Sequence, residues 1–580
     1  MNTDTGRFAF LRQLMADGIS CIFGNPGSSE ENLLDALRSP EFRELKYYLA
    51  YQEGTAVAMA DAYARAAPPR RLGNDKFAWR RPAVVQLHSY AGLANGLGMM
   101  YYARRGYTPM VIFAGEAGLR YDALDGQMAA DLVAIARPFV KSDHNGPCAW
   151  RVVDQGSLLR LLRRAIKAAA TPPMGPVFLA LPMDVLDQPN AEQAGRSLPV
   201  LSNVRPDDTT IEEAARVLRE ASHPLILMGD GVAASGAQTE LTEVADLLGA
   251  VAWGANCSEV NMPASHPLFG GYLGHMFGKE SKAVTSAADA VLICGTTVLP
   301  EVFPSVEAIF TETCKIVHFD LNSYEIGKNF PISIGALADP KAALGMLATA
   351  LKDSLTEQQL ARARDRRKAR VDAKALERNA VREKYDRVRN QMPLHASRFM
   401  SDLADRLAKL PKPALIFDEA LTHSPELLSY LPPDESGTFF QTRAGMLGTG
   451  LPGALGLKVA HPDRTVFGFC GDGSAMSTIQ ALSTASRHNI GVKFVVCNNR
   501  SYRILKYNLE VYWDAVEPAD RNFPEQFDLN SPSLRFDLLA QAQGVDAIRI
   551  EKPEEIMPAL DRALDDDRPY LLELVLSASL

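Results

Sequence analysis

Short runs of apolar residues, each followed by a stretch with a helical pattern, recur from one end of this sequence to the other. Several runs are continuous in Val, Ile, Leu and Phe, and many end in Gly, Asn or Asp. Examples are Pro82–Leu87, Pro109–Phe113, Pro176–Leu181, Pro224–Met228, Ala290–Ile293, Lys315–Phe319, Thr465–Phe469 and Lys493–Cys497. Continuous apolar strands that alternate with helices are typical of parallel sheets covered on both faces. We therefore predict an α/β protein built from doubly wound parallel sheets.

Two polar, aperiodic stretches divide the chain. Residues 187–208 are polar and contain prolines, and residues 353–392 are rich in Arg, Lys, Glu and Ala. At about 150 residues per domain, a chain of 580 residues is also too long for a single core. We predict three doubly wound domains and a solvated helical connector, with the bounds 1–187, 205–350, 353–392 (the connector) and 393–580.

Charge and composition limit the classes of function. A net charge of −8 argues against a general nucleic-acid-binding protein, which needs a basic face for the phosphates. The sequence has no run of about 18 apolar residues that would predict a membrane span, and its first residues lack the features of a secretory signal. Seven scattered cysteines without CxxC pairs are typical of free thiols in a reducing compartment. We expect a cytoplasmic protein that binds neither nucleic acid nor membrane.

The first and last segments share a glycine pattern. Ala91–Gly98 is followed by a strand ending at Gly115, and Gly450–Gly456 is followed by a strand ending at Gly471. Duplication of a common unit would produce this similarity, and chance in a Gly-rich α/β chain would produce it as well.

The most informative stretch runs from Thr465 to Asn499. Its order is a strand, a Gly-Asp-Gly-Ser turn, a helix over about 475–488, a second strand and the pair Asn498-Asn499. One βαβ unit returns the chain to the same sheet edge, so Asp472 and Asn499 should lie together at the carboxyl ends of adjacent strands. Their oxygens suit Mg²⁺, and the free N–H groups at Gly473 and Ser474 favour a phosphate. The alternative is an ordinary turn followed by a loop cap.

This constellation resembles the signature of the thiamine diphosphate-dependent enzyme superfamily. Other segments match the decarboxylase and acetolactate synthase branch, most closely the benzoylformate decarboxylases, and they do so in order: Phe23–Ser28, Tyr51–Glu53, Leu87–Ser89 and Ala444–Gly448. The resemblance implies pyrimidine-binding, middle and diphosphate-binding domains for the three predicted domains. It also implies a homodimer or homotetramer whose active sites lie between chains.

Glu53 stands between a strand-like run and an alanine-rich helix over about 56–66. In isolation, such a residue is most often a helix-capping carboxylate. The resemblance implies instead that Glu53 bonds N1′ of the cofactor's aminopyrimidine. The chemistry requires such a group, because a carboxyl bonded to N1′ favours the imino tautomer, which can take the proton from the thiazolium ring.

The resemblance also assigns the remaining cofactor contacts. Gly445 would accept a hydrogen bond from the 4′-amine, and Leu447 would hold the two rings in a bend, a proximity effect, unless it is simply a core residue. The other implied cofactor residues are Thr422, Gly473, Ser474 and Tyr502, and the implied Mg²⁺ ligands are Asp472, Asn499 and the backbone carbonyl of Ser501.

His88 and Ser28 carry the implied substrate chemistry. His88 would deliver a proton during the reaction, and Ser28 would contact the substrate carboxylate, although a lone His at a strand end is more often structural.

The sequence departs from the benzoylformate decarboxylases where these have a second histidine, since Gly295–Pro304 contains none. His266, His275 and His423 could replace it, but each is more typical of a surface or loop residue. Leu421 and Ile504 would reshape the substrate pocket.

Two further motifs are rejected as nucleotide sites. Gly448–Gly453 formally matches G-x-G-x-x-G but contains Pro452 and has no acidic ribose partner, and Gly274–Glu280 has the wrong spacing for a P-loop. Some relatives bind FAD or an ADP group in the middle domain, and nothing in this sequence demands it.

We therefore predict a thiamine diphosphate- and Mg²⁺-dependent decarboxylase that converts a 2-oxo acid to an aldehyde. The alternatives are a carboligase similar to acetolactate synthase and a cofactor-binding subunit without turnover. His88 favours the decarboxylase, because relatives specialised in carboligation usually lack a histidine at that place.

Overall fold

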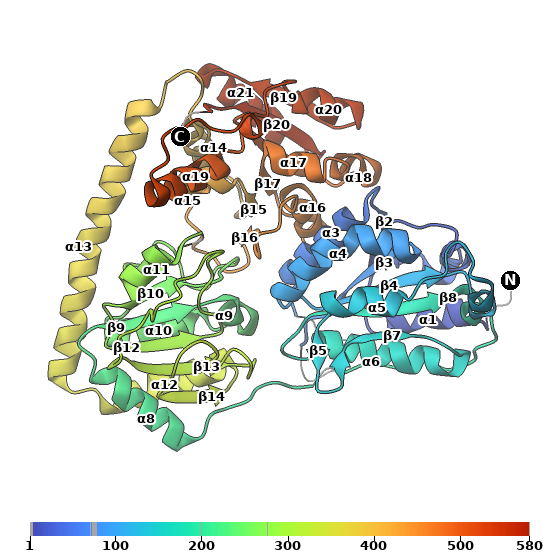
Figure 1. Cartoon of the computed structure of the whole chain (residues 1–580), viewed down its shortest axis with the longest axis horizontal. Helices are drawn as coiled ribbons and strands as arrows, with labels where there is room; N and C mark the ends of the chain where they lie inside the picture. Colours follow the sequence, from blue (N-terminus) through green and yellow to red (C-terminus); the bar gives the residue numbers. More distant parts are fainter. Residues whose placement is uncertain (1–3, 70, 72–77, 199, 275, 579–580) are drawn as a thin grey trace.

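The computed structural model describes residues 4–69, 71, 78–198, 200–274 and 276–578. Within these residues the chain forms three six-stranded parallel sheets and one two-stranded antiparallel ribbon. The three sheets belong to the three domains seen at the right, lower left and top of Figure 1. The predicted α/β class with doubly wound parallel sheets is confirmed.

The first sheet has the strand order β2-β1-β3-β4-β8-β7. Alternate residues of its strands face two separate cores, as in a sheet covered on both sides. The strands are β1 (Cys21–Gly24), β2 (Lys46–Leu49), β3 (Ala83–Leu87), β4 (Met110–Glu116), β7 (Ala149–Arg151) and β8 (Pro176–Pro182), with the ribbon β5 (Ser142–Asp143) and β6 (Gly146–Pro147). The covering helices are α1 (Gly6–Ala16), α2 (Glu31–Leu37), α6 (Leu158–Ala170) and α7 (Met183–Leu186) on one face, and α3 (Glu53–Ala66), α4 (Ser89–Arg105) and α5 (Leu132–Ala136) on the other.

The middle sheet has the order β11-β10-β9-β12-β13-β14. Its strands are β9 (Pro224–Met228), β10 (Val251–Gly254), β11 (Phe269–Tyr272), β12 (Ala290–Cys294), β13 (Lys315–Asp320) and β14 (Ile334–Leu337). Its helices are α8 (Asp208–Arg219), α9 (Asp230–Ser235), α10 (Gln238–Leu248), α11 (Gly278–Thr285) and α12 (Pro340–Ser354). The sheet is buried between two hydrophobic clusters, so it too is covered on both faces.

The third sheet has the order β16-β15-β17-β18-β20-β19, which is the order of the first sheet counted from its own first strand. Its strands are β15 (Leu415–Glu419), β16 (Phe439–Gln441), β17 (Val466–Gly471), β18 (Val492–Asn498), β19 (Asp546–Ile550) and β20 (Tyr570–Val575). Its helices are α14 (Ala396–Leu407), α15 (Ser424–Tyr430), α16 (Gly450–Ala460), α17 (Asp472–Ser477), α18 (Ala481–His488), α19 (Arg503–Val516), α20 (Phe536–Ala542) and α21 (Pro553–Leu564).

The shared strand order favours duplication, but the glycine pattern paired the wrong helices. Ala91–Gly98 lies in α4, which follows the third strand of its sheet, whereas Gly450–Gly456 lies in α16, which follows the second strand. By strand order the counterpart of α16 is therefore α3.

The helices α3 and α16 pack against each other and join the first and third domains through one continuous core. Their contact is close because of Gly456, where an added Cβ would lie 2.2 Å from the carbonyl oxygen of Met59. Glycine is therefore required at this crossing.

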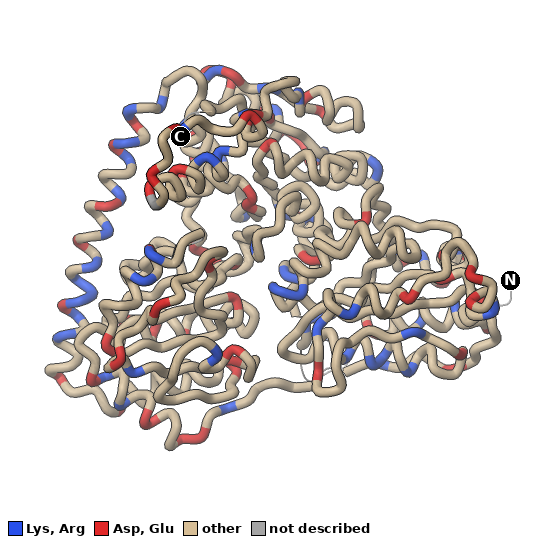
Figure 2. The backbone as a smooth tube through the Cα atoms, viewed as in Figure 1, with Lys and Arg blue, Asp and Glu red and all other residues tan. Residues whose placement is uncertain are grey.

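A single long helix, α13 (Glu357–Val388), runs through the predicted connector and along the outside of the molecule (Figure 1). Many basic residues, with fewer acidic ones among them, lie along it (Figure 2), and only Ala363 and Tyr385 of the helix are buried. Such a helix is stabilised by its capping box at Thr356 and by charge pairs rather than by a core. In the described part of the chain, no helix is both long enough and apolar enough to cross a membrane.

Two predicted helix bounds were wrong. The helix after β2 begins at Glu53 rather than at Ala56, because Gln52 caps it by accepting a hydrogen bond from the N–H of Thr55. The helix predicted over 475–488 is two helices, α17 and α18. The break lies at Thr478, whose hydroxyl donates to the carbonyl of Gly448 at 2.9 Å and so ties this turn to a neighbouring loop.

Candidate functional site

The carboxyl ends of β17 and β18 bring Asp472 and Asn499 to the same edge of the third sheet. Asp472 Oδ2 accepts from the N–H of Arg500 at 2.6 Å, and Asn499 Oδ1 accepts from the N–H of Ser501 at 3.0 Å. Arg500 has a φ of +57°, and this left-handed residue turns the chain back toward Asp472. The structure thus places the three predicted metal ligands in one loop cluster.

The atoms at this edge are hard oxygen donors. The described residues contain no group of three or more His, Cys, Asp and Glu that could hold a metal, so Asp472 would be the one carboxylate in the set. Burial raises the pKa of Asp472 to about 6, against hydrogen bonds from Gly473 and Arg500 that lower it. A buried carboxylate with amide and carbonyl oxygens beside it suits a divalent cation such as Mg²⁺.

Gly473, Ser474 and Tyr502 lie next to the edge of the third sheet that carries Asp472 and Asn499, here called the metal edge after its predicted ligands. The ring of Tyr502 would be 2.6 Å from a Cβ added at Gly473, so glycine is required beneath this ring. Tyr502 is 37% exposed. Ser474 is buried, and its hydroxyl oxygen accepts from the N–H of Gly448 at 2.9 Å. These three predicted cofactor residues therefore lie close together, at the start of α17 and directly before α19.

The turn after β15 carries Leu421, Thr422 and His423 to the same edge. Leu421 has a φ of +53°, which is strained for a bulky residue, and such strain is concentrated at functional sites. His423 is buried, and its Nε2 lies 3.4 Å from Nδ2 of Asn499. Burial lowers the pKa of His423 to about 3, and its Nδ1 has no hydrogen-bond partner among the described residues. Of the two expectations for His423, the loop position holds, since it ends the short turn after β15, but the surface position is wrong because the side chain is buried.

The segment Arg443–Gly448 forms a loop beside this edge that is exposed at Ala444, Gly445 and Leu447. Met446 N–H donates to the carbonyl of Arg443 at 3.2 Å, with φ of +54° at Ala444 and +67° at Gly445. Positive φ at both central residues defines a type I′ turn. A Cβ at Gly445 would meet no atom within 4 Å, and Leu447 is 42% exposed, so Leu447 is not a core residue.

Glu419 holds the far end of that loop. Its two carboxylate oxygens accept from the N–H groups of Gly448 and Gly450 at 2.7 and 2.6 Å. Burial raises the pKa of Glu419 to about 7, against the hydrogen bonds from Ser474 and these N–H groups. Sequence reasoning did not find this residue, although its place in Asp418-Glu-Ala-Leu-Thr422 marks it as a carboxylate at a strand end.

In the first domain, Glu53 is the first residue of α3 and is 7% exposed. Asn25 Nδ2 and Asn95 Nδ2 donate to its two oxygens, each at 3.1 Å. Both partners are neutral amides: Asn25 directly follows β1, and Asn95 lies on α4. The carboxyl of Glu53 is therefore oriented by two side chains that the sequence did not single out.

His88 and Ser28 lie at the carboxyl edge of the same sheet, and a third residue, Glu30, fixes His88. His88 Nδ1 is 2.9 Å from Glu30 Oε2 and 3.1 Å from the hydroxyl of Ser29. Glu30 is buried and also accepts from the N–H groups of Gly27 and Gly115. Because a carboxylate only accepts, Nδ1 of His88 carries the proton and Nε2 is left for other partners. Ser28 itself is exposed.

The predicted residues thus form two clusters on different domains. Glu53, His88 and Ser28 belong to the first sheet, and the metal and phosphate residues belong to the third. Among the contacts between described residues, no hydrogen bond or ion pair joins the two clusters. Of the histidines considered as a second active-site histidine, His266 pairs with Asp246 on the middle domain, and His275 lies outside the described residues.

The cysteines match their predicted state. Each of the seven cysteines of the sequence lies in the described part of the chain and is unpaired, and Cys257 and Cys314 are the ones that are not fully buried. Burial raises the pKa of Cys294 and Cys470 well above the usual range, which keeps these thiols inert.

Comparison with known proteins agrees with this geometry. Three family descriptions match successive parts of the chain: "Thiamine pyrophosphate enzyme, N-terminal TPP binding domain" over 4–135, "central domain" over 211–347 and "C-terminal TPP binding domain" over 422–574. Benzoylformate decarboxylase of Pseudomonas aeruginosa is 29% identical over 97% of both chains. Acetolactate synthase isozyme 3 large subunit of Escherichia coli is 26% identical over 98% of this chain and 94% of its own.

The fold is also found among solved structures. The crystal structure of benzoylformate decarboxylase from Polynucleobacter necessarius superposes with a TM-score of 0.81, at 22% identity and over 99% of both chains. Three consecutive family domains, matched in order over most of the chain, show that this protein belongs to the thiamine pyrophosphate-dependent enzymes.

Proposed function

We propose that this protein catalyses the non-oxidative decarboxylation of a 2-oxo acid to an aldehyde, with thiamine diphosphate and Mg²⁺ as cofactors. The observation that carries the proposal is the pair formed by His88 and Glu30 at the carboxyl edge of the first sheet, near Glu53. A decarboxylase that releases aldehyde needs a group that delivers a proton. A histidine whose Nδ1–H is held by a carboxylate can take up a second proton at Nε2 and deliver it from there, because the carboxylate balances the charge of the imidazolium. The similarity to a benzoylformate decarboxylase supports the same reaction.

The residues present fit both cofactors. Asp472, Asn499 and the Ser501 carbonyl would hold Mg²⁺. Nδ1 of the buried His423 has no hydrogen-bond partner among the described residues, so it could bond a group of the cofactor. Thr422, Gly473, Ser474 and Tyr502 would hold the diphosphate beside the metal. Gly445 and Leu447 would contact the organic rings, since the turn that carries them is exposed and open at Gly445. When bound, thiamine diphosphate supplies the nucleophilic carbon and the electron sink for loss of CO₂.

Three residues of the first domain would do the remaining work. Glu53, oriented by Asn25 and Asn95, presents a carboxyl to the ring nitrogen of the pyrimidine. His88, oriented by Glu30, gives and receives a proton at Nε2. Ser28 is exposed at the same sheet edge and would donate a hydrogen bond to the substrate carboxylate.

Leu421 and Ile504 would shape the acyl side of the pocket. Both are half-buried apolar residues at the metal edge, and they place hydrocarbon where a polar substrate group would lose its hydrogen bonds. An apolar acyl group on the 2-oxo acid is therefore favoured.

The second candidate is a carboligase, in which an acceptor aldehyde or second 2-oxo acid takes the place of the proton. Its support is the similarity to acetolactate synthase and the absence of histidine from Gly295–Pro304. A cofactor-binding subunit without turnover is the third reading, and the completeness of both clusters argues against it.

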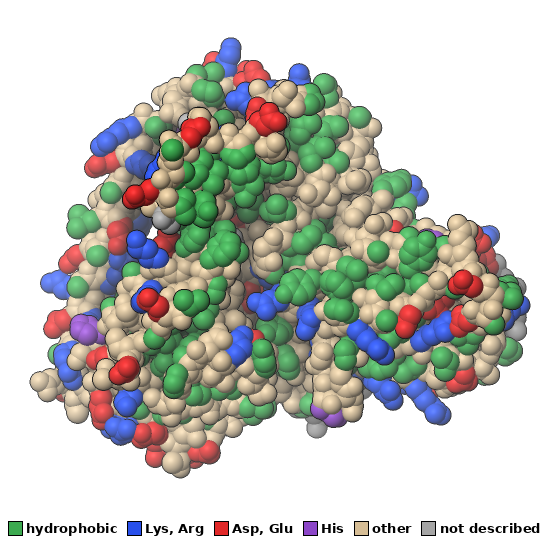
Figure 3. Space-filling view, viewed as in Figure 1, with side chains coloured by type: hydrophobic (Ala, Val, Ile, Leu, Met, Phe, Trp, Pro, Cys, Tyr) green, Lys and Arg blue, Asp and Glu red, His purple; other side chains and the backbone are tan. Residues whose placement is uncertain are grey.

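Assembly into a homodimer or homotetramer would bring the two clusters together. Hydrophobic side chains gather on the face of the third domain (Figure 3), and exposed apolar residues lie beside both clusters. They are Leu447, Met476, Tyr502, Leu505, Tyr507, Tyr512 and Val516 on the third domain, and Tyr51 and Tyr90 on the first. Apolar surface of this kind marks an interaction site. We infer that the first domain of one chain meets the third domain of another.

A product assay tests the reaction. The purified full chain, supplied with thiamine diphosphate and Mg²⁺, is given aryl, branched and straight-chain 2-oxo acids, with and without an acceptor aldehyde. Free aldehyde and CO₂ without acceptor support the proposal, whereas hydroxyketone formed only with acceptor identifies the carboligase. Glu53→Gln should lower the rate by about 10²–10⁴-fold, and the exposed Glu31→Gln serves as the matched control. If no 2-oxo acid releases CO₂, the enzyme proposal is wrong.

A further inference from the structure

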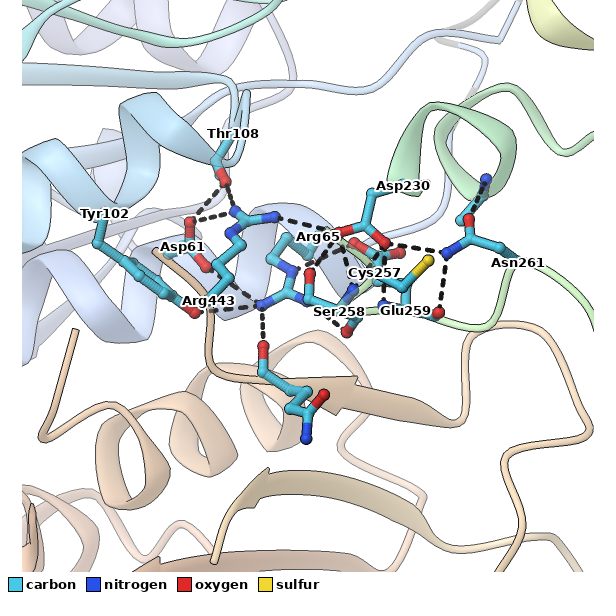
Figure 4. A network of polar contacts seen from close by, with 12 residues as sticks. Asp61, Arg65, Tyr102, Thr108, Asp230, Cys257, Ser258, Glu259, Asn261 and Arg443 are labelled. Atoms are coloured by element: carbon cyan, nitrogen blue, oxygen red, sulfur yellow. Dashed lines mark hydrogen bonds and ion pairs between the residues drawn. The ribbon is translucent and has the colours of Figure 1, made fainter. Parts of the chain in front are cut away.

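The three domains meet at a cluster of buried and half-buried charges that none of the predicted functions uses (Figure 4). Two guanidinium groups and three carboxylates gather there within a few ångströms: Arg65, Arg443, Asp61, Asp230 and Glu259. The first domain provides Asp61 and Arg65 from α3, the middle domain provides Asp230 and Glu259, and the third domain provides Arg443. Each domain therefore contributes charge to one shared cluster, here called the junction.

Arg443 is held from both other domains. Its Nη2 donates to Asp61 Oδ1 at 2.9 Å and to the hydroxyl of Thr108, and its Nη1 lies 3.9 Å from Asp230 Oδ2. Its guanidinium lies 5.3 Å from the ring centre of Tyr102. A Cβ added at Gly106 would be only 1.8 Å from Cζ of Arg443, so the first domain is shaped around this side chain.

The middle domain is fixed to the same cluster. Asp230 accepts from the N–H of Ser258 at 2.9 Å and from Asn261 Nδ2 at 3.1 Å, while Arg65 donates to the carbonyl and the hydroxyl of Ser258, each at 2.8 Å. Since Arg65 also reaches the carbonyl of Gln441 at 3.3 Å, the strand that leads to Arg443 is held as well.

Arg443 is also the first residue of the type I′ turn described above. Its carbonyl closes the turn with Met446 N–H, and the hydroxyl of Thr442 donates to the Met446 carbonyl at 2.9 Å. Ala444, the first central residue, is a non-glycine in the left-handed region and is strained there. A strained turn persists only when its surroundings fix it, and on this side the surroundings are the junction contacts of Arg443.

We propose that Arg443 is a positioning residue that fixes the Arg443–Met446 turn, and through it Gly445 and Leu447, to the junction of the three domains. The inference rests on the proposed function, in which Gly445 and Leu447 contact thiamine diphosphate. Cofactor affinity then depends on contacts between domains that do not touch the cofactor. Arg443 acts through the turn, because its own guanidinium is turned away from the loop and into the junction.

Binding measurements test this directly. Isothermal titration of thiamine diphosphate with Mg²⁺ into the full chain should show at least about a tenfold rise in Kd for Arg443→Lys. The single ammonium group of lysine cannot contact both Asp61 and Asp230 as the planar guanidinium does. Asp61→Asn should give a similar rise. The double variant should exceed either single variant by less than about threefold, because both remove one interaction.

A matched control separates positioning from general loss of a buried ion pair. Arg549 pairs with buried Glu573 at 2.7 Å at the opposite edge of the third sheet. Arg549→Lys should lower the thermal midpoint as Arg443→Lys does, yet leave Kd within about twofold of the wild type. Equal increases in Kd for both variants, or an unchanged Kd for Arg443→Lys, would overturn the proposal.

A readout without cofactor keeps this test independent of the proposed function. Hydrogen exchange of the cofactor-free chain should be faster over residues 443–448 in Arg443→Lys and unchanged there in Arg549→Lys. If the wild type binds no thiamine diphosphate, the proposed function fails and the exchange result alone decides the role of Arg443. Unchanged exchange over 443–448 in Arg443→Lys overturns it.

Discussion

Nδ1 of His88 lies 2.9 Å from Oε2 of Glu30, and the other oxygen of Glu30 accepts from the N–H of Gly115 at 2.8 Å. The imidazole is therefore attached through a buried carboxylate to the ends of two neighbouring strands. This arrangement fixes both the ring orientation and the tautomer of His88, and it leaves Nε2 free for chemistry.

Glu30→Gln should uncouple these two properties. The amide can keep the ring in place but can also donate to Nδ1, which moves the imidazole proton to Nε2. We expect kcat for aldehyde release to fall by about 10–100-fold with a smaller change in KM, because a neutral amide cannot balance the positive charge of the doubly protonated ring that delivers the proton. Nitrogen NMR of labelled His88 should show the changed tautomer without cofactor. Ser29→Ala is the control, because it removes the longer contact to Nδ1 and a hydrogen bond to Glu30 Oε1 but keeps the carboxylate beside His88. An equal loss there would contradict this role for Glu30.

Complementation between inactive variants tests the site between chains. A chain with Glu53→Gln keeps the metal edge, and a chain with Asp472→Asn keeps the first-domain cluster. If each site combines two chains, a co-expressed equal mixture should regain about a quarter of wild-type activity, since half of the dimers are mixed and each has one intact site. Activity no higher than that of the separate variants would place each site within a single chain.

Gly456→Ala should separate α3 from α16. The added Cβ would lie 2.2 Å from the Met59 carbonyl, and overpacking of this kind costs about 1–3 kcal/mol. We expect a lower thermal midpoint together with a lower kcat, because α3 begins at Glu53 and α16 begins just after the loop that carries Gly445 and Leu447. Gly345→Ala in α12 is the control, since its Cβ would meet only Glu240 Cγ at 3.9 Å and alanine favours a helix by about 1 kcal/mol. A rise in the midpoint for both variants would contradict the close crossing.

Ala444→Gly should stabilise the protein, unlike most Ala-to-Gly changes. The left-handed φ of +54° costs alanine about 1 kcal/mol that glycine does not lose. Ala380→Gly, on the exposed face of α13, should destabilise by about 1 kcal/mol through lost helix propensity. Thermal midpoints that shift in opposite directions confirm the strained turn, whereas two decreases contradict it.

His318 should make stability depend on pH. Burial lowers its pKa to about 4, with Lys328 acting in the same direction and Glu325 against it. As the pH falls below about 6.5, His318 becomes protonated in the unfolded chain, whereas in the folded chain it stays neutral until about pH 4. The free energy of unfolding therefore decreases as the pH falls through this window. From about pH 7.5 to about pH 5 the loss should reach about 2 kcal/mol, and His318→Phe should lack it. Equal shifts of the thermal midpoint in both proteins would exclude His318 as the cause.

The sequence predicted the strands and the proximity of Asp472 and Asn499 well, because both depend on local pattern. Continuous apolar runs identify buried parallel strands, and one βαβ unit places Asp472 beside Asn499 whatever the rest of the chain does. The signals for Glu53 and the turn at Gly445 likewise lie within a few neighbouring residues.

Contacts between distant segments could not be predicted in this way. Glu30 meets His88, and Asn95 meets Glu53, only because the first sheet brings their loops together. His423 was expected to be a surface or loop residue, but it is buried in a turn that contains the left-handed residue Leu421 and lies 3.4 Å from Asn499, a neighbour distant in the chain. The break between α17 and α18 depends on a bond to Gly448, far away in the chain.

The first and third sheets share one strand order, and the helices that follow their second strands pack against each other. Gene duplication and fusion would produce this arrangement, with a single polypeptide enclosing an interface that two identical subunits once formed. Specialisation after such an event would account for their differences, since α3 begins with the acid Glu53 whereas α16 begins with a glycine-rich run. Neither half is a smaller enzyme, so truncation at the connector should never yield an active fragment.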